Sequence, residues 1–158
     1  MPTEKSMTRD DVMRETLNHV RRVGILMLDA VKDMQDRAVM HDDSKFSSEE
    51  FESFAAETPN LKGLTYGSDE YREALRRIKP AIETHYSRNR HHPEFHENGI
   101  GDMTLVDLIE MLADWKAATE RHADGDLARS IEMNAKRFGY DDNLKRMLRL
   151  TANELGWL

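Results

Sequence analysis

Apolar and polar positions repeat with the period of an α-helix over much of the chain. From Val12 to Met34, apolar side chains recur about every 3.6 residues, which predicts one long amphipathic helix. Thr8 followed by Asp11 is a capping-box pattern at the start of this helix. A short apolar stretch, residues 38–40, comes next and leads into the polar motif HDDSKF.

The middle of the chain predicts shorter helices separated by turns. Ser47 with Glu50 forms a second capping-box pattern, and a short helix should start there. The segment TPNLKGLTYGS is rich in Pro, Asn and Gly and predicts a turn. Ser68 begins a further helix, which Pro80 should end or kink, unless Pro80 lies in the first turn of a new helix.

The helical repeat of apolar positions is absent from residues 87–102, which predicts a polar, His-rich loop. Thr104 with Asp107 then opens the clearest helical pattern of the chain, which runs until the sequence HADGD breaks it. Asp126 should cap the next helix and Gly139 should end it.

A last helix begins near Asp142. Together these patterns predict an all-α bundle of five to seven helices. We expect a single domain over residues 1–158, with a motif-bearing core at about 8–122 and C-terminal helices at 126–158.

Composition narrows the range of functions. The chain has no cysteine, which excludes disulfides, thiolate nucleophiles and Cys-type zinc sites. Its net charge of −7 is spread among interspersed acids and bases, which argues against extended nucleic-acid binding. No apolar run reaches the length of a membrane span and the first residues lack the apolar part of a signal peptide, so a cytoplasmic protein is expected.

Histidines and carboxylates are the candidate chemistry. His41 and Asp42 are adjacent and follow an apolar stretch, His19 lies on the long helix, and Asp114 lies on the helix with the clearest apolar face. Such ligands suit Mn, Fe, Co, Ni or Zn. The plainer alternatives are a histidine bonded to a backbone carbonyl, a carboxylate paired with an arginine, and loop histidines that are ordinary solvated surface.

Three segments resemble the HD superfamily of metal-dependent phosphohydrolases. NHVRRVGILMLDAVKDMQDRAVMHDDSKF resembles its opening, HHPEFHENGI is similar to the paired-histidine segment of the HD-GYP branch, and MLADWKAA resembles the helix that carries the final Asp. The whole sequence also looks like a family of small bacterial and phage proteins that share HDxSKF and DMTLVDLIEMLxDWKA, a likeness that implies no established activity.

The HD resemblance implies an HD-like bundle and a phosphohydrolase acting on a nucleotide or a related small phosphorylated molecule. It implies one or two divalent ions per chain (Mn, Fe, Co, Ni, Zn or Mg) and a possible homo-oligomer. The implied metal ligands are His19, His41, Asp42, Asp114, His85 and His91. Lys45 would lie near the bound phosphate.

Other residues nearby are candidates for substrate contact and proton transfer. Arg88, Arg90 and His92 are expected to bind the phosphate. Asp43 and Glu110 are candidate proton-transfer groups, as is Asp107. Two rival hypotheses remain: a non-catalytic HD-like metal-binding module that senses or sequesters a ligand or binds a partner protein, and a helical bundle with no metal.

Overall fold

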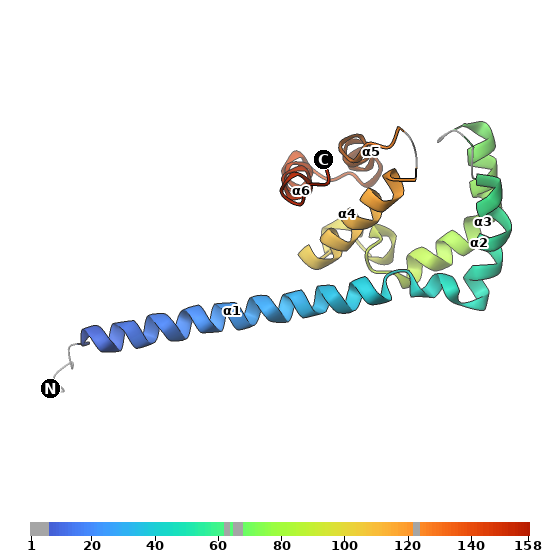
Figure 1. Ribbon diagram of the computed structural model, residues 1–158. Coiled ribbons are helices and arrows are strands. Elements are labelled where there is room, and N and C mark those ends of the chain that lie inside the picture. Colours follow the sequence, from blue (N-terminus) through green and yellow to red (C-terminus); the bar gives the residue numbers. More distant parts are fainter. Residues whose placement is uncertain (1–6, 62–63, 65–67, 122–123) are drawn as a thin grey trace. The chain divides into compact units, whose positions relative to one another are not determined.

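The computed structural model describes residues 7–61, 64, 68–121 and 124–158 (Figure 1). This part of the chain folds into helices without a strand, which confirms the all-α prediction. The α-helices are α1 (Arg9–Met40), α2 (Ser48–Leu61), α3 (Asp69–Arg88), α4 (Leu105–Thr119), α5 (Leu127–Phe138) and α6 (Asp142–Glu154). Single-turn 3₁₀ helices are η1 (Asp43–Phe46), η2 (Pro93–Phe95) and η3 (Gly99–Asp102).

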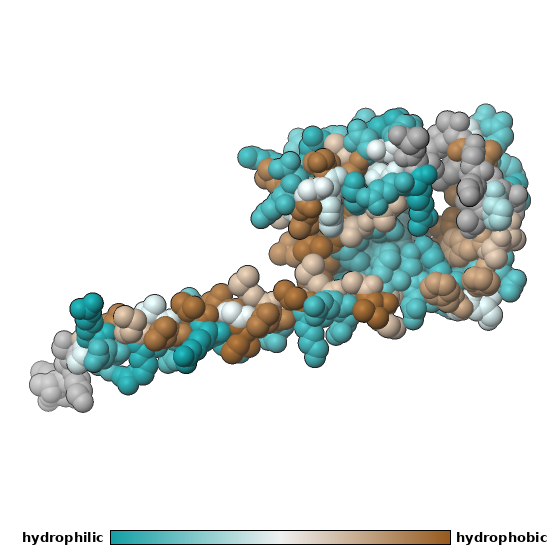
Figure 2. Space-filling model, in the orientation of Figure 1, coloured by the Kyte–Doolittle hydropathy of each residue, from teal (hydrophilic) through white to brown (hydrophobic). Residues whose placement is uncertain are grey.

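The chain divides into two compact units, residues 1–39 and residues 40–158. The first unit is essentially α1, whose predicted capping box is confirmed: the Thr8 N–H donates to the Asp11 carboxylate, and the Asp11 N–H donates to the Thr8 hydroxyl. The helix continues through residues 38–40 without a break. Figure 2 shows both apolar and polar side chains at the surface of α1. Among the described helices, none has both the length and the apolar character that a membrane span needs.

Three helices of the second unit enclose its main core. α4 packs against α5, and α5 packs against α6. The buried members of this core are Leu108, Met111, Leu112, Leu127, Ile131, Leu148 and Ala152. The predicted caps are confirmed, because Thr104 and Asp107 form a capping box, Asp126 accepts a hydrogen bond from the Arg129 N–H, and Gly139 ends α5 with φ 68°.

α2 and α3 form a second packed pair. α3 runs unbroken through Pro80, so the expected helix end at this residue is wrong. A proline removes one helical hydrogen bond, but Ile78 and Ala81 on either side of it are buried, and this burial stabilises the continuous helix. α2 likewise extends over Pro59, so the predicted turn starts later; residues 62–63 and 65–67 of that turn lie outside the described residues.

The capping box predicted for α2 is not formed. The buried Ser47 hydroxyl has no hydrogen-bond partner, and the Glu50 carboxylate accepts a hydrogen bond from the Ser44 hydroxyl instead. The predicted loop is shorter than residues 87–102 because α3 extends to Arg88 and because η2 and η3 organise its remainder.

Replacing Leu112 by Ala should lower the free energy of unfolding by about 2–5 kcal/mol, because the variant loses apolar contacts and leaves a cavity. Leu112 is 0% exposed at the centre of the core. Leu105→Ala is the matched control on the same helix: this side chain is 66% exposed, and its loss should change stability by less than about 0.5 kcal/mol. Urea unfolding followed by far-ultraviolet circular dichroism measures both, and equal small losses would contradict this core.

Candidate metal centre

Asp42 occupies a sharp turn between α1 and η1. Its φ of 58° lies in the left-handed region, and no other non-glycine residue of the described chain has a positive φ. Asp tolerates this conformation better than most residues, but it is still uncommon for a residue with a side chain. The turn brings adjacent residues, His41 and Asp42, into the same group of side chains.

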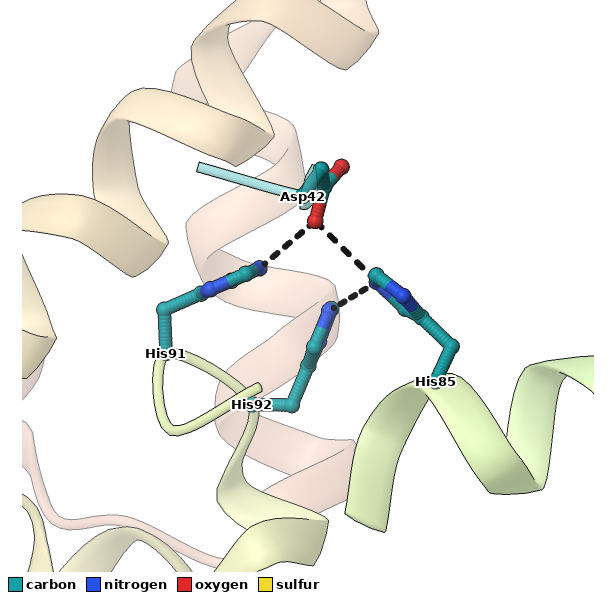
Figure 3. A group of neighbouring side chains, drawn as sticks. All are labelled: Asp42, His85, His91 and His92. Carbon is teal, nitrogen blue, oxygen red and sulfur yellow. Dashed lines mark hydrogen bonds and ion pairs between the residues drawn. The ribbon is translucent and has the colours of Figure 1, made fainter. Parts of the chain in front are cut away.

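Imidazole nitrogens surround the Asp42 carboxylate (Figure 3). Its Oδ1 lies 3.1 Å from His85 Nε2 and 3.5 Å from His91 Nε2, while its Oδ2 lies 3.5 Å from His41 Nε2. His92 Nε2 lies 3.1 Å from His85 Nε2. His85 comes from the last turn of α3, and His91 and His92 lie in the turn that follows this helix. Four histidines therefore present Nε2 atoms around one carboxylate.

α4 contributes two carboxylates to the same cluster. Glu110 and Asp114 are one helical turn apart and so share a face of the helix. Glu110 Oε1 lies 3.0 Å from His41 Nδ1 and 3.1 Å from His91 Nδ1. Asp114 Oδ1 lies 3.8 Å from His41 Nε2.

Buried polar atoms without hydrogen bonds mark the centre of the cluster. Asp42 Oδ1 and His91 Nε2 are both buried, face each other at 3.5 Å and have no hydrogen bond of acceptable geometry. Buried polar atoms almost always have such a partner, and a cation between these two atoms would satisfy both. Three groups of described residues can hold a metal ion: Asp42 with His85, His91 and His92; His41 with His91 and Glu110; and His41 with Asp42 and Asp114.

Attraction between histidines and carboxylates shifts the pKa values of the cluster when no metal is bound. Hydrogen bonds that His41 donates to the Asp114 and Glu110 carboxylates raise its pKa to about 10, against an ordinary value of 6.5. Burial opposes ionisation of Asp42, but His85 and Lys45 hold its pKa well below the usual range. Burial likewise opposes ionisation of Glu110, yet its contacts with His41 and His91 lower its pKa to about 2.

The pKa of His92 shifts in the opposite direction from the pKa of His41. Burial, together with the charges of His91 and His85, lowers the pKa of His92 to about 3. A neutral imidazole is the form that binds a metal. His92 is therefore ready to act as a ligand, whereas His41 must first lose a proton.

Lys45 lies beside the cluster, and its place near a bound phosphate stays a prediction. Its ammonium group pairs with Asp42 Oδ2 and lies 5.8 Å from the centre of the Phe54 ring. Asp43 is exposed at the start of η1 and belongs to none of the three groups of described residues. Its predicted role in proton transfer stays a prediction.

The two arginines predicted to bind phosphate each contact an acid of the fold. Arg90 pairs with Asp107 through Nε at 2.6 Å and through a terminal nitrogen at 3.1 Å. Asp107 is fully buried and also accepts hydrogen bonds from Thr104, so it stabilises the start of α4 rather than facing the cluster as a proton-transfer group. Arg88 lies 3.6 Å from Glu50 Oε1. The phosphate contacts of Arg88 and Arg90 stay predictions.

The remaining histidines belong to none of these three groups of described residues. His19 is on α1 in the first unit, whereas the three groups of described residues consist of residues 41–114 of the second. Its assignment as a ligand stays a prediction. The His96 ring donates a hydrogen bond from Nε2 to the Arg90 carbonyl at 2.8 Å, and His122, expected at the surface, lies outside the described residues.

Sequence reasoning missed the place of one side chain in the cluster. Glu50, read as a helix cap, is 0% exposed, and its Oε2 lies 3.1 Å from His85 Nδ1. No short spacing links these two residues, which are 35 positions apart. His92, a candidate for contact with phosphate, belongs to a group that can hold a metal, and its contact with phosphate stays a prediction.

A family model described as "Family of unknown function (DUF5662)" matches residues 8–156. The chain belongs to this family. The match includes α1 and nearly all of the second unit, so every residue of the three metal-holding groups lies inside the family region. No curated protein and no solved structure matches the chain.

The stability of the metal-free protein should fall as the pH rises from about 7 toward 10. The folded pKa of His41, about 10, lies above the ordinary value of 6.5. Its contribution to stability is therefore complete below pH 6.5 and is lost as the pH rises through 10. Urea unfolding in the presence of a chelator at several pH values measures this loss. The His41→Gln variant should show a weaker pH dependence, and identical slopes for the two proteins would contradict the pKa assignment.

Proposed function

We propose that this protein is a metal-dependent phosphohydrolase that acts on a phosphoester, in a nucleotide or a related small phosphorylated molecule. The observation that carries the proposal is the convergence of the four histidines on Asp42, with two buried atoms, Asp42 Oδ1 and His91 Nε2, that lack hydrogen bonds. Imidazoles and carboxylates in one buried cluster are a common ligand set for metal-assisted hydrolysis.

Asp42 is the ligand that two neighbouring cations would share. Its Oδ1 faces His85 and His91 in the group that also includes His92, and its Oδ2 faces His41 in the group that includes Asp114. One or two divalent ions per chain fit these groups. The predominance of imidazole favours Mn, Fe, Co, Ni or Zn over Mg, which prefers oxygen ligands.

One edge of the cluster is accessible to a substrate. The side chains of His41, Asp114 and Lys45 are 29%, 27% and 36% exposed, whereas His85 and His91 are buried. A structural metal site is closed by its ligands, whereas a catalytic site keeps one side open for water and substrate. The substrate phosphate is therefore expected to approach along the edge formed by these three exposed side chains.

The chain's own residues supply charge and orientation at this edge. A bound divalent ion would lower the pKa of a coordinated water and polarise a phosphoryl oxygen. Lys45, held beside Asp42, offers a positive charge to the phosphate oxygens as negative charge develops on them. Asp43, the next residue after Asp42, offers an exposed carboxylate for proton transfer.

Metal content and hydrolysis together test the proposal. Protein purified without added metal should contain about one or two equivalents of a transition metal by elemental analysis. It should also release phosphate or a nucleoside from at least one member of a panel of nucleotides, phosphomonoesters and phosphodiesters. Bound metal without hydrolysis of any panel member would reject the hydrolase in favour of a non-catalytic module. Absence of metal binding would reject both.

Asp42→Asn should abolish metal binding and hydrolysis, because Asn lacks the negative charge and offers one oxygen in place of two. Asn tolerates the left-handed backbone that Asp42 adopts, so the turn should persist. Asp43→Asn is the matched control: it removes the same charge from the exposed neighbouring residue and should leave metal content unchanged. Elemental analysis measures the metal content of both variants. Full metal content in Asp42→Asn would show that Asp42 is not a ligand.

A further inference from the structure

Two glutamates lie behind the imidazoles, on the side away from Asp42. Glu50 Oε2, from α2, lies 3.1 Å from His85 Nδ1. Glu110 Oε1, from α4, lies 3.0 Å from His41 Nδ1 and 3.1 Å from His91 Nδ1. In all three rings Nδ1 contacts a glutamate, while Nε2 lies within 3.5 Å of an oxygen of Asp42.

The hydrogen bonds around His85 determine which of its nitrogens carries the proton. The Ser44 hydroxyl donates to Glu50, and the Asn89 amide donates to the His85 carbonyl and to the Ser44 hydroxyl. Asn89 Nδ2 and Ser44 Oγ also lie 3.0 Å and 3.2 Å from His85 Nδ1, but the acceptors just named take their hydrogens when Nδ1 itself carries a proton. A carboxylate oxygen accepts hydrogen bonds, so with a cation at Nε2 the ring carries its proton on Nδ1 and donates it to Glu50 Oε2. The Nε2 lone pair of His85 is then free to bind a cation.

Glu110 imposes the same orientation on two rings at once. A single carboxylate oxygen accepts from Nδ1 of both His41 and His91. These two rings lie next to each other, with centroids 4.5 Å apart, so one acceptor can hold both in place. Each ring then directs its Nε2 atom toward Asp42.

We infer that Glu50 and Glu110 are positioning residues of the metal centre: by accepting from Nδ1 they hold His85, His41 and His91 with Nε2 as the ligand atom. This inference rests on the metal binding in the proposed function. A carboxylate hydrogen-bonded to a ligating histidine fixes the tautomer and makes the ring a better donor to the metal. Arg88, 3.6 Å from Glu50 Oε1, offsets part of the cost of burying the Glu50 charge.

The variants Glu50→Gln and Glu110→Gln test the inference, because glutamine keeps the size of the side chain and removes its charge. Glu94→Gln is the matched control: Glu94 lies in η2, close to His91 in the sequence, but it pairs with Arg137. Zn²⁺ affinity and stoichiometry are measured by titration against a chelator of known affinity. The protonated nitrogen of each imidazole is identified by ¹⁵N nuclear magnetic resonance of the Zn²⁺-loaded protein.

In the wild type, His41, His85 and His91 should each carry the proton on Nδ1. Each glutamine variant should bind Zn²⁺ about 10- to 100-fold more weakly with unchanged stoichiometry, while Glu94→Gln binds like the wild type. The Co²⁺-loaded variants should also show a shifted visible absorption spectrum, which a change in fold stability alone would not produce. Circular dichroism identifies variants that fold; if Glu50→Gln does not, Glu110→Gln, at a partly exposed position, decides the inference alone.

Unchanged affinity and spectrum in both folded glutamine variants would overturn the inference, as would protons on Nε2 in the wild type. Loss of a whole equivalent of Zn²⁺ in Glu110→Gln would instead make Glu110 a ligand and overturn its positioning role. A wild type that binds Zn²⁺ but hydrolyses nothing would reject the proposed activity and leave this inference intact. A wild type that binds no Zn²⁺ would reject both.

Discussion

The contacts of the partly buried Asp42 carboxylate with the imidazoles around it are the constraint on which the candidate site depends. Taking a carboxylate out of water is costly unless positive or hydrogen-bonding groups surround it. Here those groups come from three places in the sequence: the turn after α1, the end of α3 and the two residues that follow Arg90. Asp42 therefore contacts the end of α3 and the segment after it from the turn after α1, and a divalent cation would strengthen that connection.

α4 links this cluster to the hydrophobic core. One face of the helix carries Leu108, Met111 and Leu112, which pack against α5 and α6, and another carries Glu110 and Asp114. The capping box at Thr104, with Arg90 paired to Asp107, holds the start of the helix. A site built on a well-packed helix keeps its geometry better than one built on loops alone. The core thus contributes to the precision of the candidate site through α4.

When no metal is bound, protons balance part of the negative charge of the carboxylates in the cluster. Glu110 and Asp114 hold a proton on His41, whereas burial keeps His92 neutral. Protons and cations therefore compete for the same acids and rings. Because Glu50 and Glu110 accept from the Nδ1 atoms, this competition takes place at the Nε2 atoms around Asp42.

The sequence by itself determined the helical class and the caps at Thr8, Thr104 and Asp126, and it singled out His41 and Asp42, which lie in groups that can hold a metal. Caps and amphipathic periods depend on residues three or four positions apart, so a local pattern is enough to predict them. Only the tertiary structure decided that α3 continues through Pro80 and that Glu50 contacts His85 instead of capping α2. It likewise decided that Glu110 contacts His41, 69 residues away. Such contacts depend on how helices pack against one another, and no short spacing in the sequence encodes that packing.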